Sequence, residues 1–330
     1  MAESRTRTEA PPDDGARTEA PAERSGRTPD APTDLPKRHW KDIAKRTYRE
    51  FKDDDLTFLA AALTYYGVLS LFPALLVLVS VLGLLGTSTT QPLIDNLAGL
   101  TPGAARDVVT NAIRNLQNAS SAAGLAFVFG ILGALWSASG YVGGFMKASN
   151  IIYEVEEGRP FWKLRPLQIA VTVVLVLVAA VISISIVVTG PLAQKVGDVI
   201  GLGDTAVTVW NIAKWPVIAL VVSQVIAFLY WVAPNVRQPG YRWISPGGIF
   251  AVVLWIIASA AFAFYVANFG SYNKTYGSLA AVIIFLVWLW VTNVVILLGA
   301  EMNAEIERGR QIEQGHPPDK EPFLPERDPA

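Results

Sequence analysis

Six long apolar stretches alternate with short polar segments between residues 56 and 308. Each has at least the roughly 20 residues that a helix needs to cross a hydrocarbon core. Their continuous apolar character, without alternation of polar and apolar positions, predicts helices and not barrel strands. The expected spans are about 57–85, 122–146, 167–188, 212–232, 248–268 and 279–300. The predicted fold class is all-α, a polytopic membrane protein with six transmembrane helices and additional interfacial amphipathic helices.

The chain before the first span divides into two parts. Residues 1–36 contain six prolines and almost no large apolar side chain, so we expect a disordered N-terminal tail. Residues 37–55 place Trp40, Ile43 and Phe51 at helical spacing among seven Lys and Arg residues, which predicts a basic amphipathic interfacial helix. A solvated helix packed on the protein's own loops is the alternative.

Two further segments lie outside the spans. Thr101 and Pro102 begin a helical pattern, and the apolar stripe that continues to Leu116 predicts a helix on the outer leaflet or over the bundle. Residues 309–330 hold five prolines among acidic residues, so we expect a disordered acidic C-terminal tail after a membrane domain over 56–308.

Charge placement sets the expected orientation. The chain has 330 residues and 55 charged side chains, of which only 18 lie between residues 56 and 300. Sixteen Lys and Arg residues flank the spans on one side and five on the other. Because basic residues favour the cytoplasmic side, both termini are predicted to be cytoplasmic.

The residue types exclude most enzyme chemistry. The chain has no cysteine, and its two histidines, His39 and His316, lie in the hydrophilic ends. Phosphate-binding, zinc-protease and serine-hydrolase motifs are missing from the sequence. We therefore expect no catalytic residue, no cofactor and no metal site. A net charge of −1 gives no electrostatic reason to expect a nucleic-acid partner.

Polar side chains at membrane depth are the remaining candidates for function. They either hydrogen-bond to neighbouring helices or line a cavity, and the sequence leaves both alternatives open. Glu301 is equally explained by a helix end that extends into the cytosol. The residues expected at cavity or gating positions are Tyr66, Ser70, Pro73, Trp136, Asn150, Gln224, Asn268, Tyr276 and Glu301.

Several strings resemble the YihY/BrkB family of bacterial inner-membrane proteins. They include Ala60-Ala61-Ala62-Leu63-Thr64-Tyr65-Tyr66, Ser70-Leu71-Phe72-Pro73, Leu135-Trp136-Ser137-Ala138-Ser139, Tyr276-Gly277-Ser278-Leu279-Ala280 and Gly299-Ala300-Glu301-Met302-Asn303. The similarity covers roughly residues 40–308. It implies a six-helix protein of the bacterial inner membrane with cytoplasmic ends. The family carries old labels as ribonuclease BN and as a virulence factor, and the residues give the nuclease label no support.

These observations predict a membrane protein that transports or flips an amphiphilic, lipid-like envelope component. The alternative is a non-transporting membrane scaffold for envelope machinery, whereas ribonuclease activity is disfavoured. Expected partners are membrane lipids, with a second copy of the chain or an envelope protein as further candidates.

Overall fold

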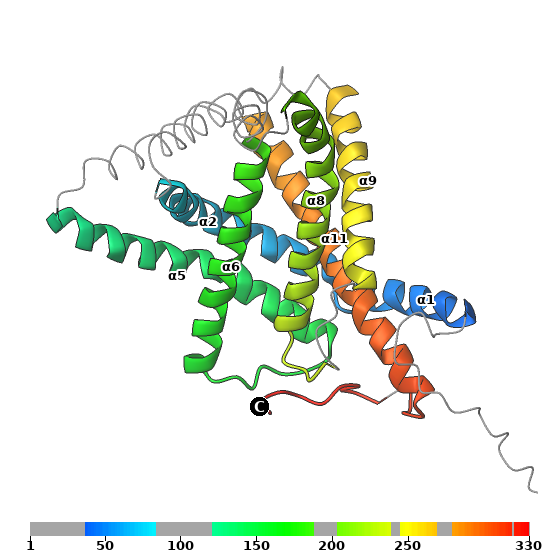
Figure 1. Cartoon of the computed structure of the whole chain (residues 1–330). Coiled ribbons are helices and arrows are strands. Elements are labelled where there is room, and N and C mark those ends of the chain that lie inside the picture. Colours follow the sequence, from blue (N-terminus) through cyan, green and yellow to red (C-terminus); the bar gives the residue numbers. More distant parts are fainter. Residues whose placement is uncertain are drawn as a thin grey trace, which may run out of the picture.

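The structure is a computed structural model that describes residues 37–83, 121–187, 203–238, 245–268, 279–318 and 320–329. Its regular secondary structure in these ranges is helical (Figure 1). The helices are α1 (Lys37–Asp53), α2 (Leu56–Gly83), α5 (Ser121–Ile152), α6 (Phe161–Val187), α8 (Gly203–Val232), α9 (Pro246–Asn268) and α11 (Leu279–Glu313). The expected N-terminal tail 1–36 and the amphipathic segment that begins at Thr101 lie outside the described residues.

Most of these helices are long and apolar enough to cross a bilayer. Within the described ranges, five segments meet that requirement: Phe129–Ile152, Phe161–Ser183, Thr208–Val232, Pro246–Asn268 and Val282–Glu313. The apolar stretch Leu56–Leu71 opens α2, which is 28 residues long in all. Large apolar side chains cover the outer surface, such as Ile212 at 70% and Phe264 at 71% exposure. Acyl chains solvate such a surface and water does not, so the chain is an all-α polytopic membrane protein.

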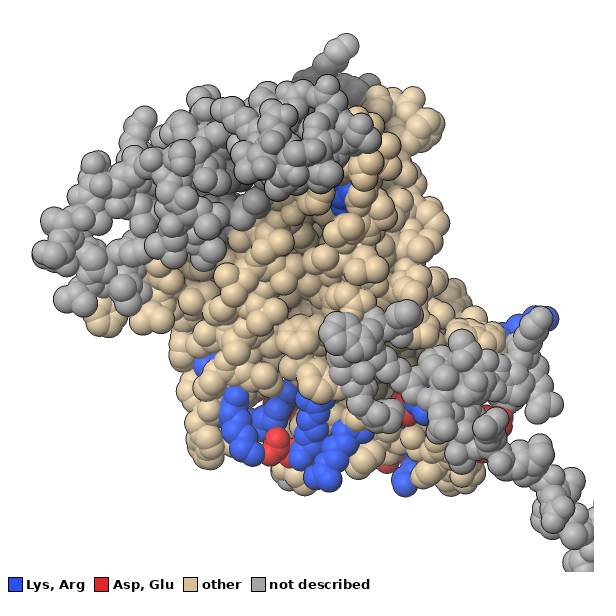
Figure 2. All heavy atoms as spheres, viewed as in Figure 1, with Lys and Arg blue, Asp and Glu red and all other residues tan. Residues whose placement is uncertain are grey.

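Several helices run beyond the spans that hydropathy predicts, and α8, for example, begins at Gly203. α5 continues to Ile152, α6 begins at Phe161, and α11 extends to Glu313. The hydropathy signal stops where charged residues begin, but helical backbone hydrogen bonds continue equally well outside the hydrocarbon core. The extended ends carry the charged residues of the fold, and Figure 2 shows most Lys, Arg, Asp and Glu side chains gathered at the lower end of the molecule.

A chain of hydrogen bonds joins α2, α5 and α11 within the bundle. The Tyr141 hydroxyl donates to Asn293 Oδ1 at 2.8 Å, and Asn293 Nδ2 donates to Thr64 Oγ1 at 3.1 Å. Thr64 donates in turn to the Ala60 carbonyl at 2.8 Å. Asn293 is fully buried, where an unsatisfied amide would cost several kcal/mol. These bonds therefore hold three helices together where water is absent.

Glycines bring α9 and α11 into backbone contact. A Cβ placed on Gly247 would lie 2.1 Å from the Gly299 carbonyl oxygen, and a Cβ on Gly299 would lie 2.5 Å from the Tyr230 hydroxyl. That hydroxyl donates to the Ile296 carbonyl at 2.5 Å. Small residues allow this approach, which is the usual way in which membrane helices pack closely.

The N-terminal helix α1 lies against the charged end of α11. Ile43 is 1% exposed and packs on Ile306. Arg46 Nε lies 2.5 Å from Glu305 Oε2, which ties the two helices by a charged hydrogen bond. The apolar side of α1 is thus covered by the protein itself.

The C-terminal segment differs from the expected disordered tail. The last helix continues to Glu313, and residues 320–329 fold back along the charged end of the bundle, drawn in red in Figure 1. Phe323 and Leu324 are buried, and Arg327 donates to the Val236 and Trp231 carbonyls, each at 2.7 Å. Two apolar side chains and one arginine thus give this polar, proline-rich segment defined contacts, where the sequence predicts a disordered acidic tail over 309–330.

Replacing Gly247 by Ala should destabilise the protein, because the new methyl group would overlap the backbone of α11. Overpacking of this kind costs about 2 to 3 kcal/mol, or several degrees in the unfolding temperature. Tryptophan fluorescence during heating in detergent measures it. Gly133→Ala is the matched control, since a Cβ there has nothing within 4 Å. Equal unfolding temperatures for G247A and G133A would contradict the close packing of α9 on α11.

Candidate functional site

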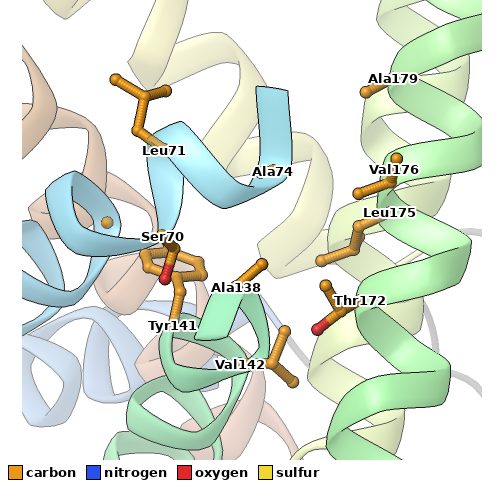
Figure 3. A pocket seen from close by; sticks show the side chains of 11 residues that line it. Ser70, Leu71, Ala74, Ala138, Tyr141, Val142, Thr172, Leu175, Val176 and Ala179 are labelled. Carbon is orange, nitrogen blue, oxygen red and sulfur yellow. The ribbon is translucent and has the colours of Figure 1, made fainter. Parts of the chain in front are cut away.

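A cleft opens between α2, α5 and α6 (Figure 3). Its volume is about 310 Å³. We call it the apolar cleft, and its lining residues are Gly67, Ser70, Leu71, Ala74, Ala138, Tyr141, Val142, Thr172, Leu175, Val176 and Ala179. Small and aliphatic side chains thus form nearly all of its wall.

Two of the three hydroxyl groups on this wall are bound to other groups of the protein. Thr172 Oγ1 donates to the carbonyl of Gln168 on its own helix at 2.8 Å. The hydroxyl of Tyr141 is bound to Asn293 on α11, so the ring alone contributes to the cleft. The cleft therefore suits hydrocarbon.

A second hollow adjoins the cleft towards the charged end of α5 and α6. Its volume is about 520 Å³, within the range typical of ligand pockets. We call it the polar pocket, and its lining residues are Gly143, Met146, Lys147, Asn150, Ile151, Val155, Glu156, Glu157, Leu164 and Gln168. It lies between the end of α5, the linker 153–160 and the start of α6.

Gly143 and Gln168 line the pocket next to residues that line the cleft. Val142 lines the cleft and its neighbour Gly143 lines the pocket, while Thr172 of the cleft and Gln168 of the pocket are one helical turn apart on α6. A Cβ on Gly143 would lie 3.0 Å from Gln168 Nε2, so glycine leaves the space that the glutamine amide occupies. We call these two residues the junction, because they are the pocket residues nearest in the chain to the apolar cleft.

Arg165 fixes the glutamine at this junction. Its NH1 donates to Gln168 Oε1 at 2.8 Å and its NH2 donates to the Trp136 carbonyl at 2.8 Å. The guanidinium also lies 4.1 Å from the centre of the Trp136 ring, which adds a cation–π contact. Both helices therefore contribute to holding the side chain of Gln168 in place.

A buried polar network forms the far wall of the polar pocket. Asn150 Nδ2 donates to Glu157 Oε2 at 3.0 Å, and Asn150 Oδ1 accepts from the backbone N–H of Asn235 at 2.7 Å. Arg159 pairs with Glu157 at 2.6 Å and donates to the Ala233 carbonyl at 2.9 Å. Burial by itself raises the pKa of Glu157, but the hydrogen bonds from Arg159 outweigh this effect, so the pKa is lower than usual overall. The network thus keeps this carboxylate ionised and ties α5 to the end of α8.

An acidic cluster lies separately, where α1, α2, α11 and the end of α5 meet. Two arginines are set against its carboxylates: Arg46 and Arg308 both pair with Glu305, and Arg308 also pairs with Glu154. Glu50, Asp54 and Glu301 complete it. No group of three such residues in the described ranges is arranged to hold a metal ion.

The carboxyl of Asp54 is strongly perturbed and lies outside the spans. Burial, with the negative charges of Glu50 and Glu154, raises the pKa of Asp54 to about 7. Burial also raises the pKa of Glu154, even though Arg308 is bound to it. Asp54 therefore takes up a proton near neutral pH, at the corner where α1 joins α2.

Comparison with known proteins settles the family. The family described as Virulence factor BrkB matches residues 47–323. The chain belongs to this family. The ribonuclease-like protein YfkH of Bacillus subtilis (strain 168) is 32% identical over 266 residues, which cover 80% of this chain and 93% of that protein.

Other BrkB-family relatives carry the name UPF0761 membrane protein. The one from Alkalilimnicola ehrlichii is 31% identical, with 77% of this chain and 55% of the relative covered. The one from Vibrio campbellii is 29% identical, with 77% and 78% covered. The chain thus spans only about half of the Alkalilimnicola protein. No solved structure matches this chain.

The structure brings two of the residues singled out in the sequence to the hollows of this BrkB-family protein. Ser70 lines the apolar cleft, and Asn150 lines the polar pocket. Trp136 lies beside the junction, where it contacts Arg165, although its own side chain is 49% exposed. Pro73 lies inside α2, next to the cleft residue Ala74.

The other candidates lie elsewhere. Tyr66 packs beside Gly144. Gln224 is half-buried on α8. The Asn268 amide donates to the Phe264 carbonyl at the exposed end of α9. Glu301 is 1% exposed and belongs to the acidic cluster. Tyr276 lies outside the described residues.

Sequence reasoning missed the residues that shape the junction and the pocket. Gly143 is one of several glycines in its span and has no distinguishing signal, and Gln168 stands at the start of an apolar run. A polar amide in the first turns of a span was the available signal for Gln168. Lys147 and Glu156 carried none, because charged residues at span ends are common.

The Asp54→Asn variant should be less sensitive to pH than the natural protein. A carboxyl whose pKa rises on folding stabilises the folded state when it is protonated, and this contribution is lost as the pH rises from about 4 to about 7. D54N should therefore be more stable at pH 8, on the order of 1 kcal/mol after allowance for solvent screening, and no more stable at pH 4. Thermal unfolding in detergent across this range measures both.

Asp42→Asn is the control for this experiment, since Asp42 is an exposed carboxylate on α1 and is not among the charges that raise the pKa of Asp54. It should keep the natural pH dependence. If D42N and D54N had the same effect, the acidic cluster would not be the origin of the pH response.

Proposed function

We propose that this BrkB-family membrane protein binds an amphiphilic, lipid-like envelope component along α5 and α6 and moves it through the membrane. The observation that carries the proposal is the adjacency of an apolar cleft and a polar pocket, joined at Gly143 and Gln168. An amphiphile has the same division of chemistry along its length. The hydrocarbon part would lie in the cleft and the polar part in the pocket.

The cleft supports the hydrocarbon half of the proposal. Helices α2 and α6 stand on either side of it, and α5 lies between them, as Figure 3 shows. Large apolar side chains on the same helices, such as Leu71 and Leu177, are exposed at membrane depth. An acyl chain could enter sideways from the bilayer without crossing a polar barrier.

The pocket supports the polar half. Its wall supplies the carboxylate of Glu156, the ammonium of Lys147 and the amides of Asn150 and Gln168. Groups of this kind orient a ligand in a pocket whose remaining wall is apolar. We place the pocket at the cytoplasmic side of a bacterial inner membrane, with both termini on that side, because the flanking basic residues favour that orientation.

The energy source and the partners belong to the proposal as well. Movement would be passive or driven by a partner, since the sequence holds no phosphate-binding motif for ATP. Membrane lipids are the expected first partners, with a second copy of the chain or an envelope protein as further ones. The printed name of the Bacillus subtilis relative describes that protein as ribonuclease-like, and our proposal assigns no nuclease step to this chain.

A non-transporting scaffold is the second candidate. It is favoured by the folded C-terminal segment, in which Asp328 pairs with Lys163 at 2.6 Å and gives the charged end a defined surface. A scaffold needs no open path along α5 and α6. The two functions therefore make different predictions for a variant whose junction is filled by a larger side chain. Lipid transfer should slow if the protein is a transporter, whereas a scaffold transfers no lipid in either form.

The Gly143→Leu variant should slow lipid movement by about tenfold or more, because the leucine side chain would fill the junction and displace the Gln168 amide. The measurement uses purified protein in liposomes that contain a fluorescent phospholipid, with a membrane-impermeant reductant that bleaches the outer leaflet. The fraction bleached over time reports transfer between leaflets.

Gly133→Leu is the matched control, because position 133 lies on the same helix and faces open space. It should transfer lipid at the natural rate. If the natural protein, shown to be folded by its thermal unfolding, transferred no lipid, the proposed function would be wrong and the scaffold would be favoured. Equal rates for G143L and G133L would place the path elsewhere.

A further inference from the structure

Two opposite charges line the polar pocket. Lys147 and Glu156 are both lining residues, and both are exposed. Within the described part of the chain, neither side chain forms a hydrogen bond or an ion pair, although the backbone carbonyl of Glu156 accepts from Asn235 Nδ2 at 3.0 Å. The backbone of the acidic residue is therefore held in place while its carboxylate is left available.

The neighbouring charged side chains are bound by other groups of the protein. Glu157 is bound by Arg159 at 2.6 Å, and Lys163 is bound by Asp328 at 2.6 Å. Arg165 donates to Gln168 and to the Trp136 carbonyl, which are neutral groups. Among the charged residues that line the pocket, Lys147 and Glu156 are therefore the cation and the anion that remain for a ligand.

The amide of Gln168 adds a neutral donor. Its Oε1 accepts from Arg165, so its Nε2 is the atom nearest to the space left by Gly143. Gln168 is 7% exposed, and its position is fixed from α6 and α5 together. An anionic oxygen at the junction would meet this N–H in the same pocket that Lys147 lines.

We propose that the polar pocket selects a lipid whose headgroup carries a phosphate diester and a primary ammonium, as in phosphatidylethanolamine. Lys147 and the Gln168 amide bind the phosphate, Glu156 binds the ammonium, and the acyl chains lie in the apolar cleft. This inference rests on the proposed function for the presence of an amphiphile, and it adds the chemical class of the headgroup.

The charge pattern distinguishes this headgroup from others. An anionic headgroup without an amine, as in phosphatidylglycerol, would satisfy Lys147 and leave Glu156 unpaired beside a phosphate. Leaving a charge uncompensated in this way weakens binding, as does like-charge proximity. Discrimination should therefore come from Glu156, and general affinity for phospholipids from Lys147.

Binding can be measured without any movement of lipid. Native mass spectrometry of the purified full chain in detergent, titrated with either phosphatidylethanolamine or phosphatidylglycerol, counts the lipid bound at each concentration. The natural protein should bind phosphatidylethanolamine about tenfold more tightly, the size expected for one charged hydrogen bond. Glu156→Gln should remove that preference, whereas Lys147→Gln should weaken the binding of both lipids.

Lys41→Gln on α1 is the control, since it changes one exposed positive charge away from the pocket. It should leave both affinities unchanged. Equal binding of the two lipids by the natural protein would overturn the assignment, and so would equal loss of both lipids in E156Q. This experiment measures binding and not movement, so the two proposals can fail separately. Selective binding of phosphatidylethanolamine without lipid transfer in liposomes would support the headgroup assignment and reject the proposed function. Lipid transfer without selective binding would support the proposed function and reject the headgroup assignment.

Discussion

The absence of water at membrane depth is the constraint on which this structure depends. A polar group there needs a protein partner, because the bilayer offers none. Asn293 meets the requirement through Tyr141 on α5 and Thr64 on α2, and Tyr230 meets it through the Ile296 carbonyl. Each satisfied group is also a link between helices. The same rule that limits polar residues in the spans therefore fixes which helices pack together.

The same constraint places the charged side chains at one end of the bundle, outside the hydrocarbon core. Arg159, Glu157 and Asn235 connect the ends of α5 and α8 to the C-terminal segment, and Arg46 with Glu305 connects α1 to α11. These pairs satisfy one another inside the network, so their net contribution to stability is modest, while removal of one partner would be costly. The bundle is thus joined twice: by neutral hydrogen bonds within the membrane and by ion pairs at its charged end.

Hydropathy predicted the helices of this fold because a span needs only length and apolar character. It identified Ser70 and Asn150 as polar residues at depth, and both line the hollows. Hydropathy does not say which faces of two helices meet, so the contact between Gly143 of α5 and Gln168 of α6 could not be deduced. The contacts of the C-terminal segment could not be deduced for a related reason: Phe323 is buried against Tyr153 of the α5–α6 linker and Arg308 of α11, which only the fold brings together.

Gly143 is needed for the space that it leaves and not for its backbone conformation. Its backbone is helical, and glycine in a helix costs about 1 kcal/mol relative to alanine, so no turn or positive φ explains its presence. What it supplies is room for the Gln168 amide, at the point where the apolar cleft meets the polar pocket. Gly133 on the same helix faces open space, where small size serves no packing contact within the described bundle. Of the two, only Gly143 lines the polar pocket, and its neighbour Val142 lines the apolar cleft, so its replacement distinguishes a protein that moves an amphiphile along this path from a scaffold that needs no path.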